Sequence, residues 1–221
     1  MNYNVNDIKD WFSFFNPEHF TDRDVDSFIE DLNNVIGFPE FSWEIGATKC
    51  CILPCGANYV IKIPFDGEMN WDDEERNYKF EFFYNGGGQE GWNYCALEDE
   101  YYADIIEGSG YEKFFLMSDC VMVNGWPIYI QQKVDICGEY STSVYPSDEA
   151  MRKLRAESNL RREVSFPDKW MAIGLENFNF DVKELDYFLG FLIDNFDDLH
   201  SGNIGYFNDQ IVIIDYAGYN S

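Results

Sequence analysis

Hydrophobic residues recur at helical spacing in the first forty residues of the chain. Phe28, Ile29, Leu32 and Val35 fall on one helical face, and they predict a helix from about Thr21 to Val35. A shorter helix is expected over Asp7–Phe15, with Asn6 as its N-cap. Because Gly37, Phe38 and Pro39 follow at once, we expect this segment to cap the main domain rather than fold alone.

From Phe41 the pattern changes to short apolar runs that are rich in β-branched and aromatic residues and separated by turn residues. The hairpin signal Asn124-Gly125 joins the last two of these runs. A helix over Trp92–Glu107, with Tyr94, Glu98, Tyr101 and Ile105 along one stripe, interrupts them. The expected strands are Phe41–Ile45, Cys50–Leu53, Tyr59–Pro64, Phe80–Tyr84, Phe114–Val123 and Pro127–Val134.

The C-terminal part reads as mainly helical. We expect a basic helix from Ser147 to about Arg162, then an amphipathic helix over Asp181–Asn195. Two short strands, Ile204–Phe207 and Ile211–Asp215, close the chain. The order predicts an α+β fold made of a helical N-terminal extension (1–40), a sheet-containing lobe (41–135) and a helical lobe that ends in a hairpin (136–221).

Composition narrows the classes of function. The chain has 221 residues, and 41 acidic against 15 basic residues give it a net charge of −26. Such a chain repels phosphate backbones and anionic lipid, which argues against direct binding of nucleic acid or membranes. No apolar run is long enough to span a bilayer, and the first ten residues lack the pattern of a signal peptide. We therefore expect a cytoplasmic protein whose six cysteines are reduced thiols rather than zinc ligands.

The last twenty-five residues carry the most informative pattern. Asp198 follows the amphipathic helix, Asn203 stands five residues later, and Asp215 ends an apolar strand twelve residues beyond Asn203. Phosphoryl transfer uses such groups: a carboxylate that orients the attacking oxygen, and an Asn with an Asp that bind Mg²⁺. Magnesium prefers oxygen ligands and keeps several waters, so two protein ligands suffice.

The segments Asp198-Leu199-His200-Ser201-Gly202-Asn203 and Ile214-Asp215 resemble the protein-kinase-like superfamily, in particular its small-molecule branch of aminoglycoside and choline kinases. The resemblance covers about residues 41 to 221. It implies a two-lobed fold with an antiparallel sheet in the N-lobe, and an ATP- and Mg²⁺-dependent phosphotransferase. Phe196 stands where the family usually has His, and the sequence given ends six residues after Asp215, so we expect a reduced C-lobe.

The resemblance also implies a role for each candidate site residue. Asp198 would be the catalytic base, and Asn203 with Asp215 would bind the metal. Lys62, in Val60-Ile61-Lys62-Ile63, would bind the phosphates and pair with Glu98, or failing that with Glu100 on nearly the opposite helix face. The remaining nucleotide-binding candidates are Gly46, Thr48 and Lys49 in the turn over the phosphates, and Gln132 and Val134 in the segment that receives adenine.

Ordinary structural interpretations compete with these roles. Asp198 and Asn203 are also typical of a turn after a helix, Lys62 of an edge strand that faces solvent, and Glu98 of a solvated helix face. A second class of function is open as well. An acidic kinase-like scaffold can be a non-catalytic inhibitor that mimics nucleic acid and occupies a basic protein, for example a bacteriophage protein that blocks a host defence. A third is a nucleotide-binding pseudokinase.

Overall fold

The computed structural model describes residues 1–14, 25–45, 49–64, 66–72, 77–83, 93–136, 148–156, 180–196, 201–208 and 210–217. The chain divides into two compact units. Unit 1 comprises Met1–Leu97 and Ser118–Lys133, and unit 2 comprises Glu98–Met117 and Val134–Ser221. The fold is a mixed α+β fold with an antiparallel sheet, as the sequence predicts. The division into residues 1–40, 41–135 and 136–221 stays a prediction.

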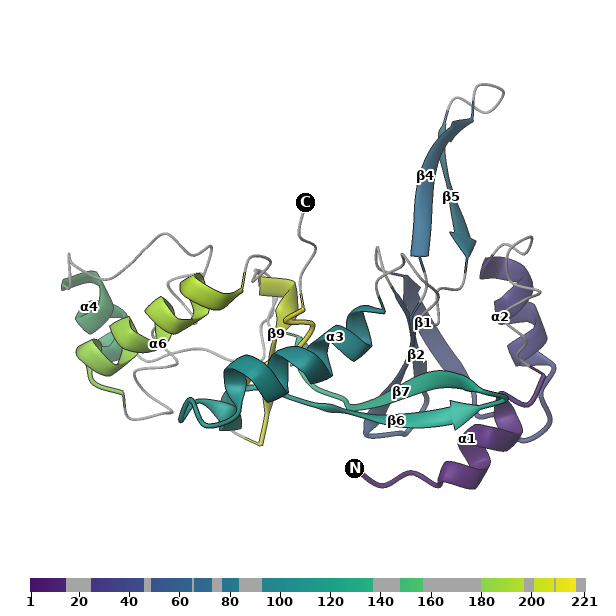
Figure 1. Ribbon diagram of the computed structural model, residues 1–221, viewed down its shortest axis with the longest axis horizontal. Coiled ribbons are helices and arrows are strands. Elements are labelled where there is room, and N and C mark those ends of the chain that lie inside the picture. The colour runs from purple at the N-terminus through teal and green to yellow at the C-terminus, as the bar shows by residue number, and fades with distance from the viewer. Residues whose placement is uncertain are drawn as a thin grey trace. The chain divides into compact units, whose positions relative to one another are not determined.

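Unit 1 is built on a five-stranded antiparallel sheet with the order β1-β2-β3-β7-β6 (Figure 1). Its strands are β1 Phe41–Ile45, β2 Lys49–Pro54, β3 Tyr59–Pro64, β6 Ser118–Val123 and β7 Trp126–Gln132. The turn between β6 and β7 is the expected one, because Asn124 and Gly125 both have positive φ, 51° and 87°. The segment Asp66–Asp72 forms a strand β4 that the sequence analysis missed; it pairs with β5, Asn77–Phe83.

The helix α3, Tyr94–Tyr101, runs from unit 1 into unit 2 and continues as a π-helical turn over Tyr102–Ile106. The prediction of a strand from Phe114 is wrong in its first part. Glu112–Phe114 is a 3₁₀ turn instead, and Phe114 and Phe115 are buried in the core of unit 2. The strand β6 therefore begins only at Ser118.

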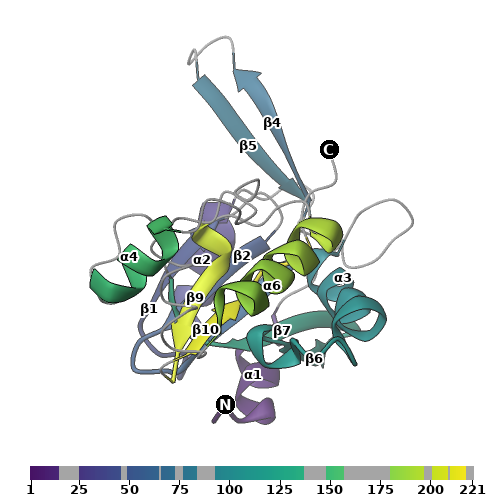
Figure 2. The ribbon, with the colours of Figure 1, turned by 90° about the vertical axis from the view of Figure 1, so that its left-hand side faces the viewer.

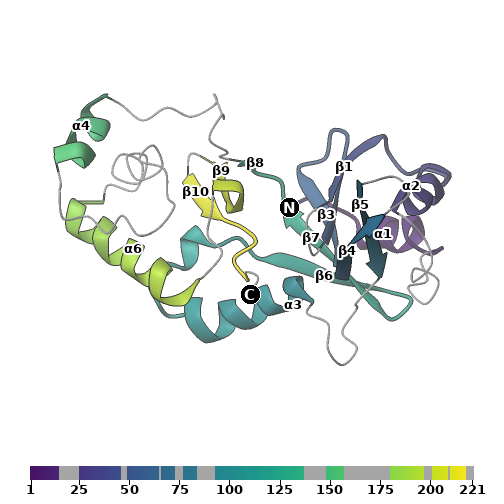
Figure 3. The same cartoon turned by 90° about the horizontal axis from the view of Figure 1, so that it is seen from above.

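Unit 2 packs the helix α6, Val182–Asn195, against the hairpin of β9, Ile204–Phe207, and β10, Gln210–Ile213 (Figures 2 and 3). Asp181 and Glu184 form a capping box that fixes the start of α6 where the sequence predicts it. A short strand β8, Asp135–Ile136, pairs with β9 on its other edge. The basic helix α4 is described over Asp148–Ala156, and the rest of its expected length lies outside the described residues.

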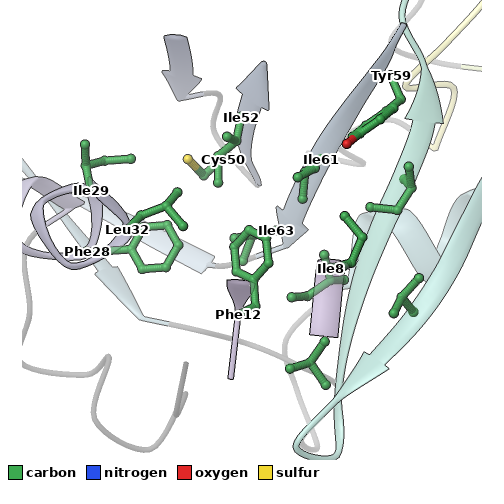
Figure 4. Close-up of a cluster of buried hydrophobic side chains, with 14 residues drawn as sticks. Ile8, Phe12, Phe28, Ile29, Leu32, Cys50, Ile52, Tyr59, Ile61 and Ile63 are labelled. Carbon is green, nitrogen blue, oxygen red and sulfur yellow. The ribbon is translucent and has the colours of Figure 1, made fainter. Parts of the chain in front are cut away.

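One face of the unit 1 sheet is apolar and is covered by α1, Val5–Trp11, and α2, Val25–Asn33. Figure 4 shows Ile8 of α1, Phe12 directly after that helix and Leu32 of α2 facing Ile52 and Ile61 of the strands. The side chain of Asn4 accepts a hydrogen bond from the backbone N–H of Asn6, so Asn4 is the N-cap of α1. The prediction of Asn6 as the cap was two residues late, because Asn4 still has extended backbone angles and Asn6 is already helical.

Candidate functional site

The opposite face of the unit 1 sheet carries a row of polar side chains. Glu44, Cys51, Lys62, Tyr129 and Cys120 are direct cross-strand partners, one from each strand in the order β1-β2-β3-β7-β6. Direct partners project from the same face of a sheet, with Cβ atoms about 5 Å apart. We call these five residues the polar row. They alternate along each strand with the residues of the apolar core, for example Ile61 and Ile63 on either side of Lys62.

Lys62 is only 3% exposed and lies on the central strand of this sheet. Lys62 is therefore not a solvent-facing lysine on an edge strand. A second lysine shares this face, because Lys49 is the partner of Pro64 and stands two residues before Cys51 on β2. Lys49 is also buried, at 7% exposure, and so is Gln131 on the same face of β7. Burying an ammonium group is costly unless other polar groups compensate it.

The start of α3 is attached to this polar face. The side chain of Asn93 accepts from the N–H of Ala96, as an N-cap does, and its Nδ2 donates to Oη of Tyr129 over 3.1 Å. Tyr129 is the direct partner of Lys62 in the polar row. Glu98 lies on the same helix and is 2% exposed, whereas the fallback Glu100 is exposed. Lys62 and Glu98 belong to different units, and their ion pair stays a prediction.

In unit 2 the fold brings Asn203 and Asp215 together across the β9–β10 hairpin. Ile204 pairs with Ile213, so Asn203 lies opposite Ile214, the residue before Asp215. Nδ2 of Asn203 donates to the carbonyl oxygen of Asp215 over 3.2 Å, and the N–H of Ile214 donates to the carbonyl of Asn203 over 2.8 Å. Asn203 is buried and Asp215 is half-buried. An amide that donates through Nδ2 presents Oδ1 as its metal-binding atom.

The backbone of Asp215 is strained. Its φ of +52° places it in the left-handed region, which costs L-residues about 1 kcal/mol or more. Packing of the next residue holds it there, since the Tyr216 ring makes edge contacts with Phe115 and Phe196 at centroid distances of 5.3 and 6.2 Å. Phe196 also contacts Tyr101 at 6.3 Å. Phe196 therefore holds this segment by aromatic packing.

The other nucleotide-binding candidates have different surroundings. Gln132 projects from the apolar face, opposite to Lys62, and its Nε2 donates to the carbonyl oxygens of Asn58 and Lys133. Val134 is half-buried and packs over Gly205 of β9, where a Cβ atom would lie 2.3 Å from the Cγ2 of Val134. The candidates Gly46, Thr48 and Asp198 lie outside the described residues.

Sequence reasoning missed Tyr129 and Asn93 as neighbours of the candidate lysine. The signal was present in β7, where Ile128 and Ile130 alternate with Tyr129 and Gln131 and so separate an apolar from a polar face. The partner strand could not be identified from the alternation alone. The contact of Asn93 with Tyr129 joins residues 36 positions apart, which no local pattern predicts.

Comparison with known proteins identifies no relative: no family model, curated protein or solved structure matches the chain. Within the described ranges, no group of three or more His, Cys, Asp or Glu residues is placed to bind a metal ion. The helices in those ranges are all too short or too polar to cross a membrane.

Proposed function

We propose that this protein is a kinase-like phosphotransferase that transfers the γ-phosphate of ATP to a hydroxyl acceptor. The observation that carries the proposal is the hydrogen bond from the side chain of Asn203 to the backbone carbonyl of Asp215, which brings an amide residue and a carboxylate residue together at the open end of the β9–β10 hairpin. The order of elements supports it. Three strands of the sheet come first, with a buried lysine on β3, then the helix α3 with a buried glutamate, then the strands β6 and β7 of the same sheet, and α6 precedes the closing hairpin.

Asn203 and Asp215 fit a magnesium ion by the chemistry of their donors, because an amide oxygen and a carboxylate are hard oxygen ligands. Two such ligands are enough for an ion that keeps waters and takes the rest of its coordination from phosphates. When bound, the ion supplies positive charge to the phosphate oxygens. The strained backbone at Asp215 agrees with this role, since strain of this kind concentrates at functional sites.

The other residues would bind and orient the reactants. The ammonium of Lys62 would bind phosphate oxygens, and Glu98 would hold that lysine in place. Asp198 would accept the proton of the acceptor hydroxyl. At the same time the oxygen of that hydroxyl would bond to the γ-phosphorus, and the bond between this phosphorus and the oxygen of the leaving ADP would break. Backbone groups near Gln132 and Val134 would receive the adenine, and Gly46 and Thr48 would lie over the phosphates.

Thermal unfolding with and without ATP and Mg²⁺ tests the nucleotide site. A ligand at about 100 times its Kd stabilises the folded state by about 2.7 kcal/mol, which raises the Tm of a protein of this size by about 5–10 °C. We expect such a shift with the wild type, dependence on Mg²⁺, and its loss in Asp215→Ala. Asp194→Ala, which changes an exposed aspartate near the end of α6, is the matched control and keeps the shift. A wild type that ATP·Mg²⁺ does not stabilise refutes the proposal.

A second function is favoured by one observation, the net charge of −26. The segment from α3 to the turn at Glu112 contributes to it with exposed Glu100, Asp104 and Glu107, and it contains no basic residue from position 94 to 112. Such a surface would bind a basic protein in place of nucleic acid. This second function predicts a partner whose binding weakens steeply as the salt concentration rises. It also predicts that substitution of Asp215 does not affect this binding. Full biological activity of Asp215→Ala would therefore favour it over the phosphotransferase.

A further inference from the structure

The strands β4 and β5 form a two-stranded ribbon whose register separates apolar from polar positions. The pairing is antiparallel, with Met69 opposite Phe80. Direct partners and every second residue along a strand belong to the same face of a ribbon. One face, which we call the aromatic face, therefore comprises Gly67, Met69, Trp71, Tyr78, Phe80 and Phe82. The other face carries the acidic residues Asp66, Glu68, Asp72 and Glu81, and Phe83 is the one apolar residue on it.

The aromatic face needs a covering layer. Within the described ranges, β4 and β5 pair with each other and with no other strand (Figure 1). A two-stranded ribbon is marginally stable in water unless a hydrophobic face of it packs against another element. The five-stranded sheet of the same unit solves this problem with helices, because α1 and α2 cover its apolar face. A helix with an apolar stripe is therefore the element that fits the aromatic face.

The charge of the ribbon identifies the kind of helix. Between positions 66 and 83 the sequence has seven acidic residues and two basic ones, Arg76 and Lys79. A second copy of this chain would bring the same negative ribbon and a net charge of −26, so like charges oppose self-association. Lysine and arginine are attracted both to carboxylates and to aromatic rings. A helix whose apolar stripe is flanked by basic residues therefore matches the ribbon in both respects.

We propose that the β4–β5 ribbon is the docking site for a basic amphipathic helix of a partner protein. Seven residues of strand span about 20 Å, and about 14 residues of helix have the same length. The inference is independent of the proposed function, because β4 and β5 contain none of the residues assigned to the nucleotide, the metal or the catalytic base. The ribbon binds the helix whether or not the protein transfers phosphate.

The first test measures the affinity of the intact protein for a labelled synthetic peptide by fluorescence anisotropy. The peptide has about 14 residues, with leucine at positions i, i+3, i+4 and i+7 of a helix and lysine elsewhere. The double variant Trp71→Thr/Phe80→Thr changes the aromatic face, and Asn70→Thr/Asn77→Thr changes the other face of the same two strands as the matched control. Both keep the charge, and threonine favours strands.

We expect the aromatic-face variant to bind the peptide about tenfold or more weakly and the control to bind it as the wild type does. A general attraction between a cationic peptide and an acidic protein is the same in all three proteins, so equal affinities overturn the inference. A peptide with glutamate in place of every lysine should not bind. Equal binding of the two peptides would also overturn the inference, because charge would then play no part.

The second test needs no variant. Hydrogen exchange of the wild type, followed by mass spectrometry, reports the backbone amides of β4 and β5 with and without the lysine peptide. We expect the peptide to slow exchange in the ribbon severalfold and to leave exchange in α6 unchanged. Unchanged exchange in the ribbon overturns the inference. So does a ribbon that exchanges as slowly as β3 and β7 in the free protein, because the chain itself would then cover the aromatic face.

Two other occupants of the aromatic face give distinct results, and either result overturns the inference. Self-association in sedimentation velocity that Trp71→Thr/Phe80→Thr abolishes would assign the face to a second copy of the chain. Binding to phosphatidylcholine vesicles that the same variant abolishes would assign it to a membrane. Failure of the proposed function is separate, since Asp215→Ala should bind the lysine peptide as the wild type does.

Discussion

The contact between Val134 and Gly205 gives the sharpest prediction on stability. Gly205 lies in β9, and a Cβ atom built on it would be 2.3 Å from Cγ2 and 2.8 Å from Cβ of Val134. Both distances are far inside van der Waals contact, so Gly205→Ala forces either Val134 or the strand to move. Overpacking of a buried site costs about 1–3 kcal/mol, and for a protein of this length that lowers the Tm by about 2–12 °C.

A double-mutant cycle separates this clash from other effects of the substitution. Val134→Ala alone removes two half-buried methyl groups and costs about 1 kcal/mol or less. It also removes the closer of the two overlaps. We therefore expect Gly205→Ala to cost less in the Val134→Ala background than in the wild type, with a coupling of at least 0.5 kcal/mol. Part of the cost remains, because the 2.8 Å overlap with Cβ is still present.

Urea denaturation monitored by circular dichroism gives the free energy of unfolding of all four proteins. Gly190→Ala in α6 cannot serve as the control, because Gly190 is itself buried. If the double variant loses as much free energy of unfolding as the two single variants together, the reasoning is refuted, because the side chains at positions 134 and 205 then do not contact each other. A Gly205→Ala variant as stable as the wild type would refute it as well. The result does not depend on any assignment of function.

Three further predictions concern the core, the pH dependence and the thiols. Phe196→Ala removes a buried ring that packs against Tyr216, so it should lower the free energy of unfolding in urea titrations by about 3–5 kcal/mol. The control Tyr187→Ala, at an exposed site of α6, should change it by less than about 0.5 kcal/mol. Backbone hydrogen bonds, above all to its own N–H, lower the pKa of Glu112, so Glu112→Gln should destabilise the protein at pH 7 and the difference in Tm should shrink as the pH falls below 4.5. Burial raises the pKa of the Cys50 thiol, so iodoacetamide at pH 8 should modify exposed Cys55 long before Cys50; equal rates would contradict the burial.

The parts of the fold that the sequence predicts well are those that local interactions determine. The helix α6 begins within one residue of its predicted start because Asp181 and Glu184 form a capping box next to an amphipathic run. The closing hairpin is also determined locally, because its two strands are joined by a short turn. The hairpin brings Asn203 and Asp215 together, since the two residues stand at the two ends of the same antiparallel pair of strands. The strand β4 escaped prediction because its alternation is diluted by acidic residues and only its pairing with β5 reveals it.

The polar face of the unit 1 sheet could not be predicted in the same way. Whether Lys49 and Lys62 share a face depends on the register of β2 against β3, and a shift of one residue would place them on opposite faces. The pairing of Lys62 with Tyr129 depends further on β7, which is more than sixty residues away in the chain. Local propensity is nearly the same for every such register, and the apolar face packed by α1 and α2 selects the one observed.

The cost of these features bears on the choice between the two proposed functions. Two buried lysines on one face, a buried glutamate on α3 and an aspartate at positive φ each lower the stability of the folded state relative to simpler residues. A protein whose role is only to present an acidic surface gains nothing from them, because its partner would contact exposed carboxylates. A protein that binds the phosphates of a nucleotide and a metal ion needs cations and oxygen ligands held away from water. The buried polar groups therefore favour the phosphotransferase, and the acidic surface remains compatible with it.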